Sequence, residues 1–250
     1  MRKQNKTDNE QPNLALVIPA YNAGEGLANT LQKVLNYLES KKYRSEVIIV
    51  DDGSTDETAS IAKKFSNSRD NVKLLENGSN RGKGYSIKRA VLASQSQHII
   101  FTDADLPYAV EDIENFLYWL SHGYDIVIGS RRLPESEVHH APAIHRKYMG
   151  RIFNTIVSIL TSRGFADTQC GYKGFKRETT QFIFEKQLIN RFAFDIELLY
   201  LARKNKLSIK ELPVKLSSSQ FSTVKLLRDP LNMLRDVFKI RLNDWLGKYK

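Results

Sequence analysis

Short apolar runs alternate with helical patterns along the first 130 residues, and no other feature of the chain constrains the fold as strongly. Five runs have the length and composition of buried strands, at residues 14–19, 46–51, 72–76, 98–102 and 124–129. Apolar residues recur at helical spacing in the intervals, for example at Leu27, Leu31 and Val34. Strands that alternate with helices form right-handed crossovers and a mostly parallel sheet covered on both faces. The sequence therefore predicts an α/β fold of Rossmann-like topology.

The boundaries of several elements are also readable. Ser54 as N-cap and Glu57 three residues later predict a capping box that begins the second helix. The second half of the chain is less regular, and we expect helices over 146–161 and 195–204 and a strand over 207–214.

Three segments are expected along the chain: a flexible N-terminal tail over 1–12, a folded α/β domain over 13–221, and a basic amphipathic helical extension over 222–250. The apolar stripe of that helix comprises Leu231, Leu234, Phe238, Leu242 and Trp245. Arginine and lysine flank the stripe. Such a helix can lie in a membrane interface or dock on the protein core, and the sequence favours the two equally.

The chain has a formal net charge of +10, which favours a polyanionic partner such as nucleic acid, an anionic membrane surface or a phosphorylated substrate. Its one cysteine, Cys170, excludes an intramolecular disulfide and a cysteine-rich zinc site and indicates a reducing compartment. No apolar run approaches the roughly 20 residues needed to cross a bilayer, so no membrane-spanning segment is expected.

Acidic residues follow two of the predicted strands, at the sheet edge where α/β proteins bind ligands. Asp103 and Asp105 emerge together after one strand with only Ala104 between them. Two hard oxygen ligands at this spacing suit Mg²⁺ or Mn²⁺ bound to a diphosphate, and a solvated loop or helix cap is the alternative. Asp51 and Asp52 end another strand and could accept hydrogen bonds from a base or ribose, or cap the next helix.

Basic residues lie at the same edge. Residues 80–84, with Lys83, open a helix where backbone N–H groups can bind phosphate, although the spacing is not that of a P-loop. Arg131 follows the fifth strand and Arg146 lies on the next expected helix, and both could contact phosphate or simply be solvated.

Taken together, these motifs resemble those of family 2 inverting glycosyltransferases of the GT-A fold, in particular the dolichyl-phosphate glucosyltransferase and dolichyl-phosphate mannose synthase group. The resemblance spans roughly residues 14–246. It rests on residues 18–22 (IPAYN), 50–54 (VDDGS), 80–84 (NRGKG), 103–106 (DADL), 129–131 (GSR), 167–173 (DTQCGYK) and 192–197 (FAFDIE). The DTQCGYK run points to the glucosyltransferase branch.

The resemblance implies roles for individual residues. Those expected to bind the nucleotide sugar are Pro19, Ala20, Tyr21, Asp51, Asp52, Lys83, Asp103, Ala104 and Asp105. The metal, Mg²⁺ or Mn²⁺, would be held by Asp103 and Asp105. The residues expected to contact the acceptor are Arg131, Arg146, Gln169 and Lys225, and Lys225 replaces a lysine that the family often has at the position of Thr223. The expected catalytic set is Asp103, Asp105, Arg131, Arg146 and Asp195.

The implied reaction is transfer of a hexose, glucose before mannose, from a nucleotide sugar to a polyprenyl phosphate with inversion. A phosphate monoester is ionised near neutral pH and can attack without a strong protein base. If the acceptor were a hydroxyl of a cell-envelope glycan or glycolipid, Asp167, Asp195 or Glu197 would have to take its proton. A basic nucleic-acid-binding module is the non-enzymatic alternative, but no such motif is present and no nucleic-acid partner is expected.

Family members often carry transmembrane helices, and none is expected in this chain. We therefore expect peripheral attachment to the cytoplasmic face of an anionic membrane, either directly or through a membrane-protein partner.

Overall fold

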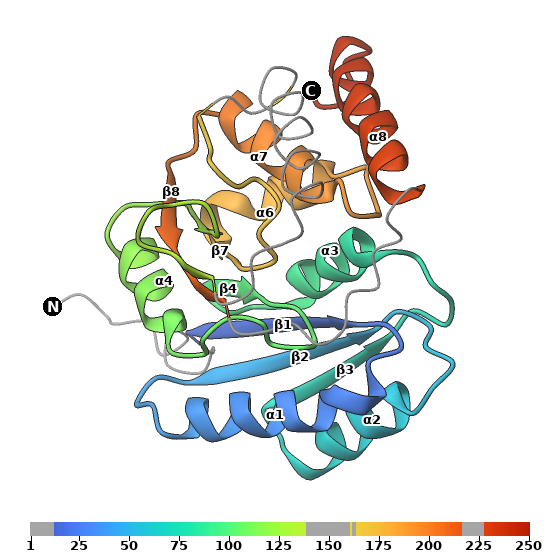
Figure 1. The fold of residues 1–250 in the computed structure, drawn as a ribbon, viewed down its shortest axis with the longest axis vertical. Helices are drawn as coiled ribbons and strands as arrows, with labels where there is room; N and C mark the ends of the chain where they lie inside the picture. The colour runs from blue at the N-terminus through green and yellow to red at the C-terminus, as the bar shows by residue number, and fades with distance from the viewer. Residues whose placement is uncertain (1–12, 139–160, 162–163, 217–227) are drawn as a thin grey trace, which may run out of the picture.

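The computed structural model describes residues 13–138, 161, 164–216 and 228–250 (Figure 1). Its centre is a seven-stranded sheet in the order β3-β2-β1-β4-β7-β5-β8. The strands are β1 Leu14–Ala20, β2 Ser45–Asp51, β3 Val72–Glu76, β4 His98–Phe101, β5 Ile126–Ser130, β7 Lys173–Lys176 and β8 Ile209–Pro213. A second, small sheet pairs β6 (Glu137–Val138) with β9 (Lys215–Leu216). The five strands predicted in the first half are all present, each within two residues of its expected bounds.

Helices cover both faces of the sheet, as expected for strands that are apolar on both sides (Figure 1). The helices are α1 Gly24–Glu39, α2 Thr58–Ser68, α3 Lys83–Ala93, α4 Asp112–Ser121, α6 Arg177–Lys186, α7 Phe194–Lys204 and α8 Arg228–Trp245. One apolar cluster joins one face of the sheet to α1, α2 and α4. The other cluster joins the opposite face to α3, α6, α7 and α8. The fold prediction of a mostly parallel α/β sheet flanked by helices is confirmed.

β7 is the one strand of the large sheet that runs against the others, and the sequence did not predict it. It pairs antiparallel with β4 on one side and with β5 on the other. Lys173, its first residue, is level with Phe101 at the end of β4 and with Ile128 in β5. The segment that precedes β7 therefore lies at the carboxyl ends of these two strands.

The predicted capping box at Ser54 and Glu57 is wrong. α2 begins at Thr58, and neither side chain bonds to its first turn. Ser54 Oγ instead accepts a hydrogen bond from the backbone N–H of Asn22, at 3.0 Å. The Asp56 carboxylate accepts from the N–H of Thr58, at 3.0 Å. Tertiary contact with the loop after β1 has replaced the local cap, because Asn22 needs a partner for its backbone N–H there.

α8 packs on α7 through Val237 and Ile240, which are fully buried. Its predicted apolar stripe does not make this contact, because Phe238, Leu242 and Trp245 are exposed. The helix thus has two apolar faces, one docked and one open. Among the described residues, no helix has the length and apolar character required to cross a membrane.

Candidate functional site

The carboxyl edge of the sheet gathers most of the residues selected from the sequence. Pro19, Ala20 and Tyr21 end β1, and Ala20 lies level with Asp51 at the end of β2. The N–H of Asp52 donates to the carbonyl of Ala20 at 2.8 Å, which joins the two strand ends. Tyr21 is 41% exposed, so its ring is accessible to a ligand at this edge.

Asp52 organises the loop that leads into α3. Its carboxylate accepts hydrogen bonds from the Asn77 side-chain amide at 2.7 Å and from the N–H groups of Arg81 and Gly82 at 2.9 and 2.8 Å. These bonds fix the turn before Lys83, rather than capping the helix that directly follows β2. Asp51 is also buried, and its carboxylate accepts a long bond, 3.3 Å, from the N–H of Ser54.

Lys83 extends from the start of α3 to Asp103, where its ammonium group contacts Oδ1. Burial lowers the pKa of Lys83, but the charges of Asp103 and Asp195 outweigh it and raise that pKa above its usual value. The start of α3, which follows β3, and the loop after β4 are therefore joined by an ion pair at the centre of the edge.

Asp103 and Asp105 fit a divalent cation. Burial, and then the charge of Asp103, raises the pKa of Asp105 to about 6. A cation beside the pair would favour the ionised form of Asp105. Within the described part of the chain no cluster of three or more potential ligands exists. Mg²⁺ commonly binds one or two carboxylates and takes its other ligands from water and a substrate phosphate.

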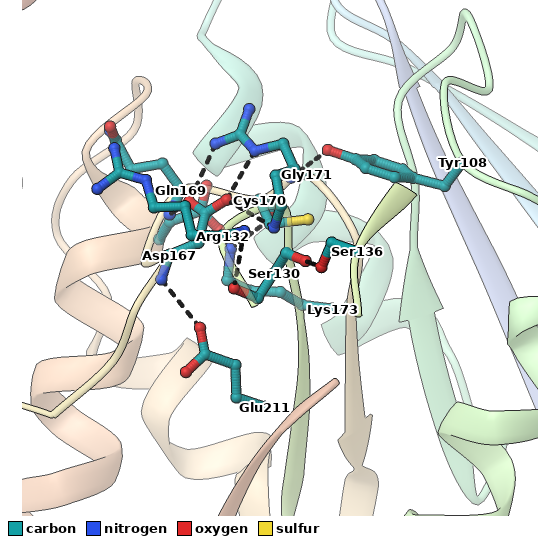
Figure 2. A network of polar contacts seen from close by, with 12 residues as sticks. Tyr108, Ser130, Arg132, Ser136, Asp167, Gln169, Cys170, Gly171, Lys173 and Glu211 are labelled. Atoms are coloured by element: carbon teal, nitrogen blue, oxygen red, sulfur yellow. Dashed lines mark hydrogen bonds and ion pairs between the residues drawn. The ribbon is translucent and has the colours of Figure 1, made fainter. Parts of the chain in front are cut away.

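The segment before β7 lies between the ends of β4 and β5, because β7 pairs with both strands. Figure 2 shows its residues Asp167, Gln169, Cys170 and Gly171 near Ser130, the last residue of β5. Asp167 receives two bonds from the Arg131 guanidinium, from Nε at 2.7 Å and from Nη2 at 3.0 Å. Burial alone would raise the pKa of Asp167, but Arg131 outweighs it and lowers the value to about 2. The Arg131 side chain remains 38% exposed, so it presents an oriented positive charge at the edge.

Gly171 lies directly against Asp103. A Cβ atom at position 171 would overlap the Asp103 carboxylate. The Gly171 N–H donates to the hydroxyl of Tyr108 at 3.2 Å (Figure 2). The Tyr108 ring stacks on that of Tyr172, with 5.3 Å between the ring centroids. Absence of a side chain at this position is therefore what allows Asp103 to occupy its place.

A buried ion pair lies where this segment joins β7. Lys173, with no exposed surface, pairs with Asp195 of α7 at 2.9 Å and also donates to the carbonyl of Cys170. Burial raises the pKa of Asp195, although Lys173 and Lys83 both act to lower it. Glu197, two residues later on α7, is fully buried and accepts from the N–H groups of Leu188 and Ile189.

Comparison with known proteins identifies the family. Residues 15–184 match the model described as glycosyl transferase family 2. The chain belongs to this family. The glycosyltransferase fold inferred from the sequence motifs is thereby supported independently.

Curated relatives agree with this result. A dolichyl-phosphate beta-glucosyltransferase of Dictyostelium discoideum is 33% identical over 99% of this chain and 79% of its own length. One from Homo sapiens is 32% identical over 97% of this chain and 79% of its own length. Among solved structures, glucosyl-3-phosphoglycerate synthase from Mycobacterium tuberculosis in complex with UDP has a TM-score of 0.67 at 16% identity, covering 93% of this chain and 79% of that one.

The glycosyltransferase structure brings together most of the predicted site, but not all of it. Gln169 lies in the segment before β7, with its amide 3.9 Å from Met233 Sδ on α8. Arg146 and Lys225 lie outside the described residues. The sequence analysis assigned no role to Tyr108 or Gly171. The glycine of the DTQCGYK motif is the signal that could have indicated a close contact between the backbone and another group there.

We predict that Gly171→Ala displaces Asp103 and weakens Mn²⁺ binding in the presence of UDP by about tenfold or more. The backbone at Gly171 is not in the left-handed region, so alanine is compatible with the chain and only the Asp103 side chain is in its way. Titration calorimetry measures the effect. Gly174→Ala, a control in β7 whose Cβ would meet only apolar side chains, should leave Mn²⁺ binding unchanged; equal affinities for wild type and Gly171→Ala would contradict the assignment.

We also predict a pH-dependent loss of stability in Asp167→Asn. The pKa of Asp167 falls from 3.8 to about 2 on folding, so its pairing with Arg131 contributes about 2 kcal/mol above the unfolded pKa. The difference in unfolding free energy between wild type and variant should be present at pH 7 and shrink as the pH falls from about 4 towards 2. Urea unfolding at several pH values measures it, and a difference that persists at pH 2.5 at its full size would refute the pairing.

Proposed function

We propose that this chain transfers glucose from UDP-glucose to a polyprenyl phosphate, such as dolichyl phosphate, with inversion at the anomeric carbon. The names of the curated relatives support the donor sugar and the acceptor. Related folds in complex with Mn²⁺ and UDP-glucose support the nucleotide. The observation that carries the proposal is the state of the three carboxylates that could have served as a general base.

None of these carboxylates is free. Asp167 is paired with Arg131, Asp195 with Lys173, and Glu197 is enclosed by backbone N–H groups. A hydroxyl acceptor needs one of them to take its proton, whereas a phosphate monoester attacks as an anion. The geometry therefore favours a phosphate acceptor over the hydroxyl of a glycan or glycolipid.

The donor would bind where the ends of β1, β2 and β4 meet. Asp103 and Asp105 would hold Mg²⁺ or Mn²⁺, which when bound supplies Lewis-acid neutralisation of the departing diphosphate. Tyr21 offers an exposed ring to the base, and Asp51 a buried carboxylate to the nucleoside. Lys83 adds a positive charge beside Asp103 that favours the diphosphate over neutral ligands.

The acceptor would bind beside β5. Arg131, held in one orientation by Asp167, would contact the acceptor phosphate and direct an oxygen towards the sugar. Asp167 thus acts through Arg131 rather than on the substrate. Gln169, Arg146 and Lys225 remain proposed acceptor contacts.

The open face of α8 would bring the site to the lipid. Phe238, Leu242 and Trp245 lie on one side of the helix, and Trp245 is 84% exposed. Exposed Arg235 and Lys239 lie beside them, as in helices that bind anionic membrane interfaces. Cys170 is a buried free thiol, which fits a reducing compartment and hence the cytoplasmic face. Attachment through a membrane-protein partner would use the same face.

The reaction is tested with purified protein, UDP-glucose, Mn²⁺ and a short polyprenyl phosphate. We expect a glucosylated polyprenyl phosphate and no product from the corresponding polyprenol, because only the phosphate is an anion at neutral pH. Asp105→Asn should lower kcat/KM by about 100-fold or more through loss of the metal. The control Asp70→Asn, at an exposed position between α2 and β3, should retain activity. Equal turnover of polyprenol and polyprenyl phosphate would contradict the proposed acceptor. Absence of product with every common donor would contradict the proposed reaction.

Membrane attachment is tested by sedimentation with vesicles of anionic phospholipid. Trp245→Ala should weaken binding by about tenfold, since it removes the most exposed apolar side chain of α8. Tyr118→Ala, an exposed aromatic on α4 across the sheet, is the matched control and should bind as wild type does. Added salt should weaken vesicle binding of both variants. Equal binding of Trp245→Ala and Tyr118→Ala would contradict a role for α8 in membrane attachment.

A further inference from the structure

The penultimate residue, Tyr249, is buried in the core although it follows the exposed end of α8. Only 1% of it is accessible, and it belongs to the apolar cluster of α3, α6 and α7. Its hydroxyl donates a hydrogen bond to Oε1 of Glu197 on α7. Burial of a tyrosine hydroxyl and a carboxylate costs desolvation free energy, and the hydrogen bond between the two groups offsets that cost.

Glu197 holds the segment over 187–190. Besides the bond from Tyr249, its carboxylate accepts from the N–H of Leu188 at 3.1 Å and from that of Ile189 at 2.8 Å. It is fully buried, and that burial raises its pKa. Every oxygen of this carboxylate is thus occupied by a donor that depends on the fold around it.

The held segment packs against the loop that carries Lys83. The N–H of Tyr85 donates to the carbonyl of Asn190 at 3.0 Å, and the Gln187 side chain donates to the carbonyl of Gly84 at 3.0 Å. Gly82 has a φ of +102°, and a Cβ there would lie 2.5 Å from the Asn190 carbonyl oxygen. The 187–190 segment therefore contacts the loop before Lys83 on one side, and Asp52 holds the same loop through hydrogen bonds.

We propose that Tyr249 is a positioning residue for the donor site, which it reaches through Glu197, the 187–190 segment and the loop before Lys83. Loss of the tyrosine hydroxyl leaves Oε1 of the buried Glu197 with the N–H of Leu188 but without its side-chain donor. The carboxylate then shifts, its bonds to Leu188 and Ile189 loosen, and Lys83 is less firmly placed beside Asp103. This inference deepens the proposed function and rests on it for the identity of the donor.

Tyr249→Phe removes the hydroxyl alone. Tyr200→Phe is a matched control, because Tyr200 also donates from α7 to a carboxylate of α8, Asp244, and its ring lies 6.3 Å from that of Tyr249. Among the described residues, its hydroxyl partners, Asp244 and Arg241, make no bond to the 187–190 segment. Both variants lose one bond between α7 and the end of the chain, but only one loses the connection to Lys83.

We expect Tyr249→Phe to weaken binding of UDP with Mn²⁺ by about tenfold in calorimetry, with the KM for polyprenyl phosphate unchanged, and Tyr200→Phe to bind UDP as wild type does. Hydrogen exchange of the free protein gives a second readout that needs no nucleotide. Amides of residues 82–85 should exchange faster in Tyr249→Phe than in Tyr200→Phe.

Each outcome has one meaning. Equal UDP affinity and equal exchange in Tyr249→Phe and wild type would overturn the inference. Equal weakening in both variants would also overturn it, by assigning the effect to docking of α8. A wild type that binds no UDP contradicts the proposed function alone, because the exchange comparison still decides whether Tyr249 acts on the Lys83 loop.

Discussion

The ammonium group of Lys173 joins β7 to α7, and Lys173 has no exposed surface. A buried unpaired charge is strongly unfavourable, so Lys173 can begin β7 only where a carboxylate meets it. Asp195 on α7 supplies that carboxylate, the Cys170 carbonyl accepts a further bond, and the ring of Phe101 lies 5.8 Å away. Placement of β7 between β4 and β5 is thus inseparable from docking of α7 on the sheet.

The insertion of β7 decides what the active edge contains. In a purely parallel sheet, the ends of β4 and β5 would be neighbours, and the Asp103 and Arg131 loops would meet directly. The antiparallel strand places the segment before it between them. That segment contacts both sides, since Gly171 lies against Asp103 and Asp167 holds Arg131. Asp103 and Arg131 are therefore both in contact with the same short segment.

Three cations of the edge are each paired with a carboxylate: Lys83 with Asp103, Arg131 with Asp167, and Lys173 with Asp195. Such pairing fixes positive charges in place before a ligand arrives, which limits the reorganisation needed to bind phosphate. It also removes these carboxylates from general-base catalysis. The same contacts that build the site thereby select the kind of acceptor that can react in it.

The sequence by itself determined the elements whose signals are local. Apolar period and length located β1 to β5, because these signals depend on neighbours along the chain. The paired aspartates after β4 likewise predicted a metal site at this edge of the sheet. The motif resemblance added the family. By contrast, β7 contains two lysines and a glycine in four residues, and no local pattern marks it as a central strand.

Tertiary structure alone decided how distant residues pair. From the sequence, Ser54 was predicted to cap a helix, whereas in the structure it bonds to the loop after β1. The expected stripe of α8 suited a membrane interface and a docking face equally, and the structure shows that Val237 and Ile240 dock instead. The bond from Tyr249 to Glu197 spans 52 residues. Burial and long-range pairing set the role of each of these side chains, and neither is encoded in the spacing of residues along the chain.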